Sequence, residues 1–225
     1  MKRYSRNMNM LTTEENNSLS SFKVCVIGCG GLGGYIIEML SRLGIGQITA
    51  VDYDVFEETN LNRQILSSMS SLGKSKAIVA KERISNINPL VKIDPIIEKL
   101  TEENAVEILK GHDVIVDALD NVKTRLVVEK HAEKLNIPLV HGAIAGWYGQ
   151  VTTVFPGEKT LSILYGDKDT KGLESELGNP SFTPALVASI EVSEVLKILI
   201  KRGALLRKKL LMINTLSQEY EVIEL

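Results

Sequence analysis

The chain has 225 residues, with 26 basic and 28 acidic side chains and a formal net charge of −2. Hydrophobic residues make up 44% and charged residues 24%, which is ordinary for a globular protein and excludes a disordered chain. The near-neutral balance also excludes a generally basic nucleic-acid coat, so we do not expect nucleic acid as a partner.

No part of the sequence has the pattern of a membrane span, a secretory signal or a disulfide framework. The uncharged run 24–37 is interrupted by glycines, whereas a span needs about 20 apolar residues. No apolar stretch of a signal peptide follows the first ten residues. The cysteines are Cys25 and Cys29, too few for a four-cysteine zinc site. We therefore expect a cytoplasmic protein with no membrane contact.

A polar arm, residues 1–22, precedes an alternation of strands and helices. Strands are expected at short apolar runs rich in branched residues, and helices where apolar residues recur at helical spacing. The expected strands are 22–28, 47–51, 91–97, 113–118 and 138–140, and the expected helices are 32–43, 74–87, 101–109 and 122–135. Pro95 lies within the third strand and predicts that this strand is at a sheet edge.

The pattern changes in the last third of the chain. The expected elements there are a strand over 149–155, a helix over 184–201 and a terminal hairpin of strands 209–214 and 219–225. Between them, we expect the glycine-rich stretch 157–181 to be a flexible crossover loop. The order of elements predicts one α/β domain over 23–225. It is Rossmann-like, a mostly parallel sheet with helices on both faces and an antiparallel C-terminal extension.

A glycine-rich loop joins the first expected strand to the first expected helix. Its sequence, GCGGLGG, places Gly28, Gly30 and Gly33 in the spacing G-x-G-x-x-G. Glycine at these positions lets the backbone turn tightly and approach a phosphate, which the helix N-terminus then favours. Asp52 ends the next strand, at about the separation where an acid meets a ribose hydroxyl. The loop therefore predicts nucleotide binding without specifying the nucleotide.

Residues downstream of the loop favour a triphosphate. Arg63 and Lys76 can supply the fixed cations that a triphosphate needs. Asp120 follows an expected strand, where ligands gather in open α/β sheets, and can hold Mg²⁺ together with phosphate oxygens. An NAD-dependent oxidoreductase has no evident need for these three residues, but the glycine loop alone would suit one, so that class is kept as an alternative.

Taken in this order, the motifs resemble those of the ThiF/MoeB/HesA family, the bacterial relatives of ubiquitin-activating enzymes. They are R-Y-S-R at the start, the glycine loop, D-x-D, N-L-N-R-Q, G-K-S-K, L-D-N, H-G-A-I-A-G-W-Y-G-Q-V and N-P-S-F-T-P-A-L-V-A. The resemblance implies a homodimeric adenylyltransferase that uses ATP and Mg²⁺. Its substrate would be the Gly-Gly C-terminus of a small ubiquitin-like sulfur-carrier protein, in molybdopterin, thiamine or related sulfur transfer.

The resemblance also implies roles for individual residues. Gly31 and the other loop glycines would cradle the nucleotide, Asp52 would hold the ribose, and Asp120 would bind Mg²⁺. The residues implied at the phosphates are Asn60, Arg63 and Lys76, with Gln64 and Asn121 supporting them and Asp54 of the D-x-D motif nearby. Arg6 resembles an arginine that reaches into the partner's ATP site in dimers of the family. The implied catalytic residues are thus Arg6, Arg63, Lys76 and Asp120.

The sequence departs from the family in its cysteines. Many relatives carry two C-x-x-C pairs that bind zinc and a crossover-loop cysteine that carries a thioester or persulfide, and this chain has neither. We therefore expect adenylation alone, without zinc. Cys29, inside the glycine loop, is either a nucleophile or a small residue tolerated in a tight turn. The other alternative function, within the same superfamily, is a tRNA-modifying dehydratase that activates a carboxylate.

Overall fold

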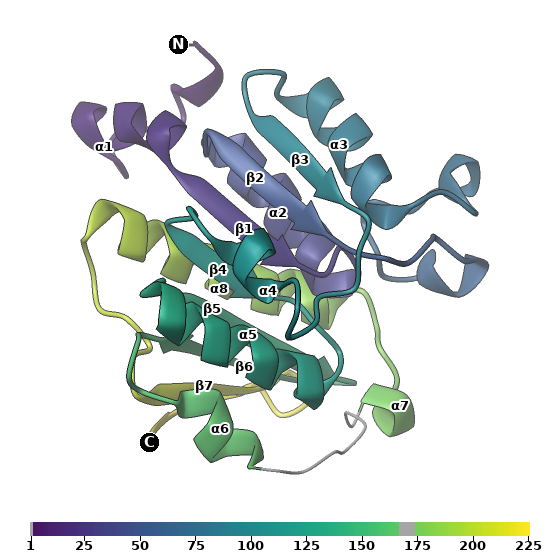
Figure 1. Cartoon of the computed structure of the whole chain (residues 1–225), viewed down its shortest axis with the longest axis vertical. Coiled ribbons are helices and arrows are strands. Elements are labelled where there is room, and N and C mark those ends of the chain that lie inside the picture. Colours follow the sequence, from purple (N-terminus) through teal and green to yellow (C-terminus); the bar gives the residue numbers. More distant parts are fainter. Residues whose placement is uncertain (1, 167–173) are drawn as a thin grey trace.

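The computed structural model describes residues 2–166 and 174–225, which form one sheet of eight strands with helices on both faces (Figure 1). The strand order is β3-β2-β1-β4-β5-β6-β7-β8. The parallel strands are β1 (Lys23–Ile27), β2 (Gln47–Val51), β3 (Lys92–Ile96), β4 (Val114–Asp117) and β5 (Leu139–Ala145). The antiparallel strands are β6 (Tyr148–Val154), β7 (Lys209–Asn214) and β8 (Glu219–Glu224). The expected Rossmann-like fold with an antiparallel extension is confirmed.

Two layers of helices cover the sheet (Figure 1). One layer is α2 (Gly31–Leu43), α3 (Lys76–Ile87) and α8 (Phe182–Ile200), and the other is α4 (Ala105–Leu109), α5 (Val122–Leu135) and α6 (Thr160–Tyr165). Two short helices, α1 (Thr13–Ser18) and α7 (Glu174–Leu177), lie at the periphery. Because strand side chains alternate, Val24 and Val26 pack under the first layer and Cys25 and Ile27 under the second. Both faces are buried, which explains the continuous apolar run of β1.

The structure changes several expected boundaries. The helix expected at 74–87 begins at Lys76, because Ser75 forms an extended bridge with Val55. The strand expected at 138–140 continues to Ala145, because β6 pairs along its full length. Pro95 lies in β3 at the sheet edge, as expected.

The crossover stretch 157–181 is partly helical, since α6 and α7 lie within it, while 167–173 fall outside the described residues. Among the helices that the structure does describe, none combines the length and apolar character needed to cross a membrane.

The N-terminal arm folds onto its own chain. Arg3 Nη1 donates to the Ile87 carbonyl at 2.5 Å, and Asn88 Nδ2 donates to the Tyr4 hydroxyl at 2.8 Å. These partners lie just before β3, so the arm packs at the amino ends of the parallel strands (Figure 1).

Candidate active site

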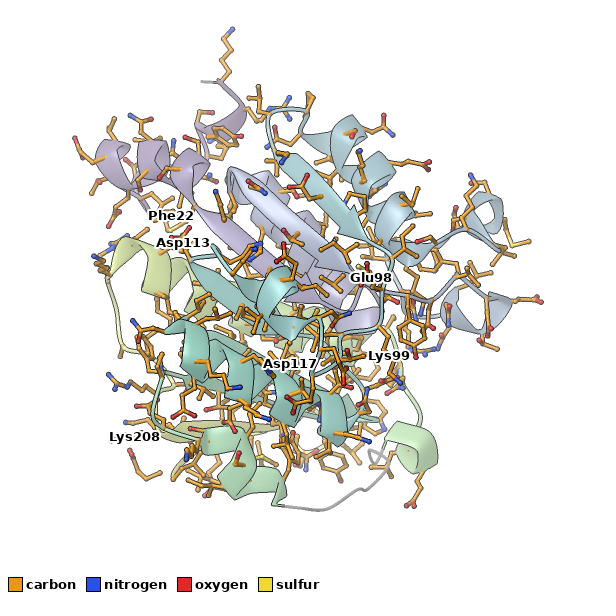
Figure 2. The ribbon with its side chains drawn as sticks, viewed as in Figure 1. Phe22, Glu98, Lys99, Asp113, Asp117 and Lys208 are labelled. Carbon is orange, nitrogen blue, oxygen red and sulfur yellow. The ribbon has the colours of Figure 1, made fainter. Side chains whose placement is uncertain are left out.

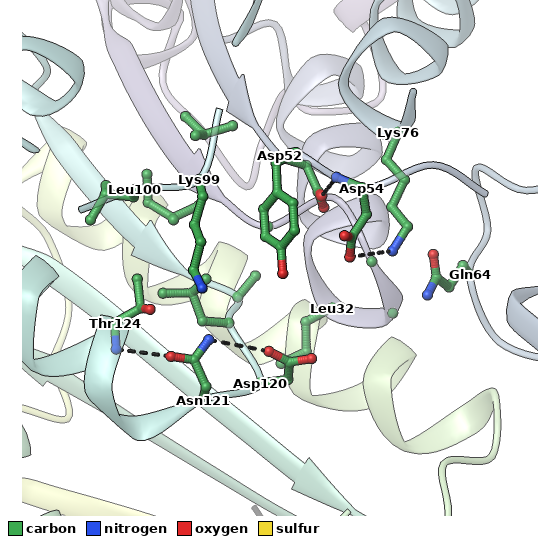
Figure 3. A pocket seen from close by; sticks show the side chains of 18 of the residues that line it. Leu32, Asp52, Asp54, Gln64, Lys76, Lys99, Leu100, Asp120, Asn121 and Thr124 are labelled. Atoms are coloured by element: carbon green, nitrogen blue, oxygen red, sulfur yellow. Dashed lines mark hydrogen bonds and ion pairs between the residues drawn. The ribbon is translucent and has the colours of Figure 1, made fainter. Parts of the chain in front are cut away.

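A cleft opens at the carboxyl ends of the parallel strands, beside the N-terminus of α2 (Figure 3). It holds about 1020 Å³ of empty space, part of it open solvent. Ten of the predicted nucleotide-site residues line it: Gly28, Gly30, Gly31, Asp52, Asp54, Arg63, Gln64, Lys76, Asp120 and Asn121. Figure 2 shows Glu98 and Lys99, which follow β3, at this end of the sheet, and Phe22 and Asp113, which precede β1 and β4, at the other.

The glycines of the loop have two different roles. Gly28 has φ +101°, and a Cβ there would lie 2.6 Å from the Ala118 carbonyl oxygen. A Cβ on Gly33 would lie 1.8 Å from the Gly28 carbonyl oxygen, so α2 can pack this closely only with glycine there. A Cβ on Gly30 or Gly31 would meet side-chain atoms no closer than 3.6 Å. Packing does not require glycine at these two positions, but they border the cleft, where a phosphate would approach the helix N-terminus.

Asp52 ties the glycine loop to the end of β2. Its Oδ2 accepts from the Cys29 N–H at 2.7 Å, and its Oδ1 accepts from the Asp54 N–H at 2.9 Å. Burial raises the pKa of Asp52, although both N–H groups and the charge of Lys76 oppose the rise. Each carboxylate oxygen keeps a further lone pair, which a ribose hydroxyl can use.

Two cations flank the loop. Lys76 begins α3, and its side chain is only 9% exposed, with Nζ 3.3 Å from Asp54 Oδ2. Arg63 donates through Nη1 to the Thr59 carbonyl and to Asn62 Oδ1, both at 2.9 Å. Its other guanidinium N–H groups make no hydrogen bond within 2–166 and 174–225. The cleft therefore offers positive charge that the protein only partly neutralises.

Asp120 presents a carboxylate on the other side of the cleft (Figure 3). It is exposed, and Asn121 Nδ2 donates to its Oδ1 at 3.4 Å. Asn121 Oδ1 in turn caps α5 by accepting from the Thr124 N–H at 2.9 Å. In the part of the chain that the structure describes, no cation pairs with Asp120. It thus remains available to a metal ion.

Three predicted residues are not among the described lining of the cleft: Gly33, Asn60 and Arg6. Asn60 is buried, and its Oδ1 accepts from the Glu57 N–H at 3.0 Å while its carbonyl accepts from the Gln64 N–H at 2.9 Å. It therefore supports the loop that carries Gln64. Arg6 is exposed and belongs to the N-terminal arm, which packs at the amino ends of the strands, opposite the cleft of its own chain.

The cleft also contains residues that sequence reasoning missed: Tyr53, Glu98, Lys99, Leu100, Leu119, Thr124, Arg125, Ile144 and Asn179. Lys99 Nζ lies 5.7 Å from the centre of the Tyr53 ring, a cation–π contact. Residues 98–100 follow β3, so the strand-end rule that identified Asp120 could have found them. Asn179 begins the N-P-S-F-T-P-A-L-V-A motif, which was recognised without a role for this residue, whereas Arg125 has no comparable local signal.

Two acceptor atoms in the cleft lining lack a partner in the part of the chain that the structure describes. Gln64 Oε1 and Asn179 Oδ1 are buried and have no hydrogen-bond partner among the described residues. Buried polar atoms are nearly always hydrogen-bonded, so donors of a ligand or of water are expected there.

Cys29 does not have the environment of a nucleophile. Its side chain is buried in the hydrophobic core, and burial, with a contribution from Asp52, raises its thiol pKa well above the ordinary value. The alternative of a small residue tolerated in the turn agrees with this environment. No three His, Cys, Asp or Glu side chains of residues 2–166 and 174–225 gather as a metal site, so ligand oxygens would have to complete any metal coordination here.

The fold is Rossmann-like, with a charged cleft at the carboxyl ends of its parallel strands. Residues 4–225 match the ThiF family, and the chain belongs to that family. It is 33% identical to the SAMP-activating enzyme E1 of Haloferax volcanii, over 99% of this chain and 84% of that protein. It is 35% identical to the sulfur carrier protein adenylyltransferase of Thermus thermophilus, over 98% of this chain and 85% of that protein. The crystal structure of E. coli MccB with ATP has the same fold, with a TM-score of 0.84 and 21% identity. The match covers 99% of this chain and 70% of that chain.

Proposed function

We propose that this chain is an ATP-dependent adenylyltransferase that activates the C-terminal glycine carboxylate of a small ubiquitin-like sulfur-carrier protein. The observation that carries the proposal is the meeting of Arg63, Lys76 and Asp120 around the glycine loop in one cleft. The two relatives, named as a SAMP-activating E1 and a sulfur carrier protein adenylyltransferase, support the substrate class.

The charges of the cleft suit a triphosphate. Lys76 and the unused N–H groups of Arg63 would bind phosphate oxygens through charge-assisted hydrogen bonds. The N-terminus of α2, open over Gly30 and Gly31, would add backbone donors. A dinucleotide has only two phosphates and less need for both cations.

Asp120 fits a magnesium ion. It is an exposed carboxylate without a cationic partner in the described chain, and Mg²⁺ is usually held by one or two carboxylates with phosphate oxygens and water. Bound there, the ion would neutralise charge on the phosphates during their separation.

The reaction needs no general base, because a C-terminal carboxylate is already ionised near pH 7. The carboxylate would attack the α-phosphorus in line, forming an acyl–AMP bond while the bond to pyrophosphate breaks. The protein's part is to align the two reactants and to stabilise the charge that develops on the phosphates.

Arg6 would act on the cleft of a second copy of the chain. The arm that carries it packs at the far end of its own sheet, and within 2–166 and 174–225 Arg6 makes no hydrogen bond or ion pair. This placement supports contribution in trans, and hence a homodimer. The cytoplasmic location and the absence of zinc remain parts of the proposal that rest on the sequence.

Calorimetric titration of Mg-ATP and of NAD tests the nucleotide without knowledge of the carrier. We expect Mg-ATP to bind and NAD to give no heat of binding. Arg63→Ala should weaken Mg-ATP binding by about 1.5–3 kcal/mol, or about 10- to 140-fold, the value of a charged hydrogen bond. Arg42→Ala is the control, because Arg42 pairs with Glu38 away from the cleft.

Binding of NAD, with no binding of Mg-ATP, would overturn the proposal. The substrate class is then tested by mass spectrometry of a purified sulfur carrier with a Gly-Gly terminus after incubation with Mg-ATP. An acyl-adenylate at that terminus, lost when the last glycine is removed, is the expected product. The same incubation with tRNA in place of the carrier tests the dehydratase alternative.

A further inference from the structure

A buried polar network lies behind the cleft, on the face of the sheet covered by α5 and α6. Its centre is the hydroxyl of Tyr165, the last residue of α6. That oxygen lies 2.9 Å from His141 Nε2, 2.5 Å from Gln150 Nε2 and 3.1 Å from Arg125 Nη1. Since these partners belong to β5, β6 and α5, one hydroxyl joins three elements.

The donors and acceptors of the network follow from its chemistry. Asp117 Oδ2 lies 2.7 Å from His141 Nδ1, and a carboxylate accepts, so Nδ1 carries the proton and Nε2 is the acceptor. Burial lowers the pKa of His141, which keeps the ring neutral. Arg125 and Gln150 present nitrogens, which donate. The Tyr165 O–H therefore donates to His141, and its lone pairs accept from the other two, so its bonding capacity is fully used.

Arg125 connects this network to the lining of the cleft. Its Nη2 donates to the Leu119 carbonyl at 2.5 Å, and Asp117 Oδ1 accepts from the Leu119 N–H at 3.0 Å. Both polar groups of the Leu119 backbone are thus held by side chains of the network. Asp120 is the next residue, so its position depends on how Leu119 is held.

α6 is anchored at both ends, which makes Tyr165 a fixed point. At the start of the helix, Glu129 accepts from the Leu161 N–H at 2.6 Å and from the Ser162 N–H at 2.9 Å. At the end, the Arg125 guanidinium lies 5.4 Å from the centre of the Tyr165 ring. Replacing tyrosine by phenylalanine would keep the ring contact and remove only the hydroxyl.

We propose that Tyr165 is a positioning residue for the metal side of the nucleotide site. Its hydroxyl orients Arg125, Arg125 holds Leu119, and Leu119 sets the place of the Asp120 carboxylate. The inference rests on the proposed function, in which Asp120 binds Mg²⁺ beside the phosphates. α6 thereby acts on the metal ion without touching the ligand, as the outer partners of metal ligands do in other proteins.

The test is the Mg²⁺ dependence of ATP binding, measured by calorimetry with ATP alone and with increasing Mg²⁺. In Tyr165→Phe we expect the half-saturating Mg²⁺ concentration to rise about tenfold. This is the lower end of the loss in metal affinity that follows when a residue supporting a metal ligand is replaced. The affinity for metal-free ATP should stay unchanged. If the role of Tyr165 were merely structural, the affinity for Mg²⁺ and the affinity for metal-free ATP would both fall. Tyr220→Phe is the matched control, because Tyr220 is exposed on β8 and its hydroxyl has no hydrogen-bond partner in the described chain.

Asp120→Asn separates this inference from the proposed function. If wild type does not bind Mg-ATP, the proposed function fails. If Asp120→Asn shifts the Mg²⁺ dependence and Tyr165→Phe does not, only the role of Tyr165 is overturned. In the Asp120→Asn background, Tyr165→Phe should have no further effect, since both changes act through one carboxylate.

A second variant keeps the proposal testable if Tyr165→Phe does not fold. Gln150→Leu removes one hydrogen bond to the Tyr165 hydroxyl, and Gln150 is not among the described residues of the cleft lining. It should shift the Mg²⁺ dependence in the same direction, and an unchanged value would overturn the proposal.

Discussion

Glu191 allows a prediction of how stability depends on pH, because it is a buried carboxyl group with no hydrogen-bond partner within 2–166 and 174–225. It lies on α8, and neither of its side-chain oxygens has a partner among the described residues. Gly142 on β5 makes room for it, since a Cβ there would come within 2.4 Å of the Glu191 carboxyl carbon. Burial, reinforced by the charge of Asp117, raises the pKa of Glu191 well above its ordinary value of 4.5, although Arg125 opposes the rise.

The raised pKa makes the protein less stable as the pH increases. Below pH 4.5 both the folded and the unfolded chain hold the proton of Glu191, and nothing is lost. Above that pH the unfolded chain releases the proton and the folded chain keeps it, so unfolding becomes coupled to proton release. Each pH unit between the two pKa values then lowers the free energy of unfolding by about 1.4 kcal/mol.

Glu191→Gln replaces the carboxyl group by an amide of the same shape that does not titrate. Relative to wild type, we expect the free energy of unfolding of the variant, measured in urea, to rise by up to about 1.4 kcal/mol per pH unit as the pH increases above about 4.5. Glu194→Gln is the control one turn further along α8. Glu194 accepts from the Thr153 hydroxyl and the Leu206 N–H, so its replacement should lower the free energy of unfolding by about 1–3 kcal/mol. Parallel curves of stability against pH for wild type and Glu191→Gln would refute this reasoning.

Two further predictions concern the glycine loop and the arm. Gly33→Ala should lower the free energy of unfolding by about 3 kcal/mol, measured by thermal melting, because its Cβ would lie 1.8 Å from the Gly28 carbonyl oxygen. Gly31→Ala should fold, because a Cβ there has room, but it should weaken ATP binding. Arg6→Ala should lower the adenylation rate about 10³-fold, as in other phosphoryl transfers, with Mg-ATP binding kept. Mixing Arg6→Ala with Lys76→Ala chains should restore activity, because a mixed dimer has one intact site; no recovery would argue against action in trans.

Much of the sheet is predictable because burial on both faces leaves a continuous apolar run. β1 and β4 lie within the expected ranges 22–28 and 113–118 for this reason. Helix ends are less predictable, because side chains compete for the first N–H groups. The helix expected over 101–109 begins only at Ala105, since Asn104 Oδ1 accepts from the Thr101 N–H at 2.8 Å and holds a turn.

The cleft residues that the sequence predicted have a local signature. Asp52 and Asp120 follow strands, and the cations belong to short motifs of polar residues. Arg125 has no such signature, since in the sequence it is one more basic residue of an amphipathic helix. Its burial beside the cleft depends on Asp117, which ends a different element, and on Tyr165, 40 residues later. Only the folded chain brings these three together.

α6 shows why such contacts are beyond local patterns. It has six residues, fewer than the 11–18 or so over which helical periodicity can be judged, and isolated helices this short are unstable in water. Its first N–H groups bond to Glu129, 32 and 33 residues earlier, and its end is tied through Tyr165 to β5, β6 and α5. The helix therefore exists because of the sheet and α5 around it. The contacts that form it are also those that orient Arg125, so the fold of this segment and the position of Asp120 cannot vary independently.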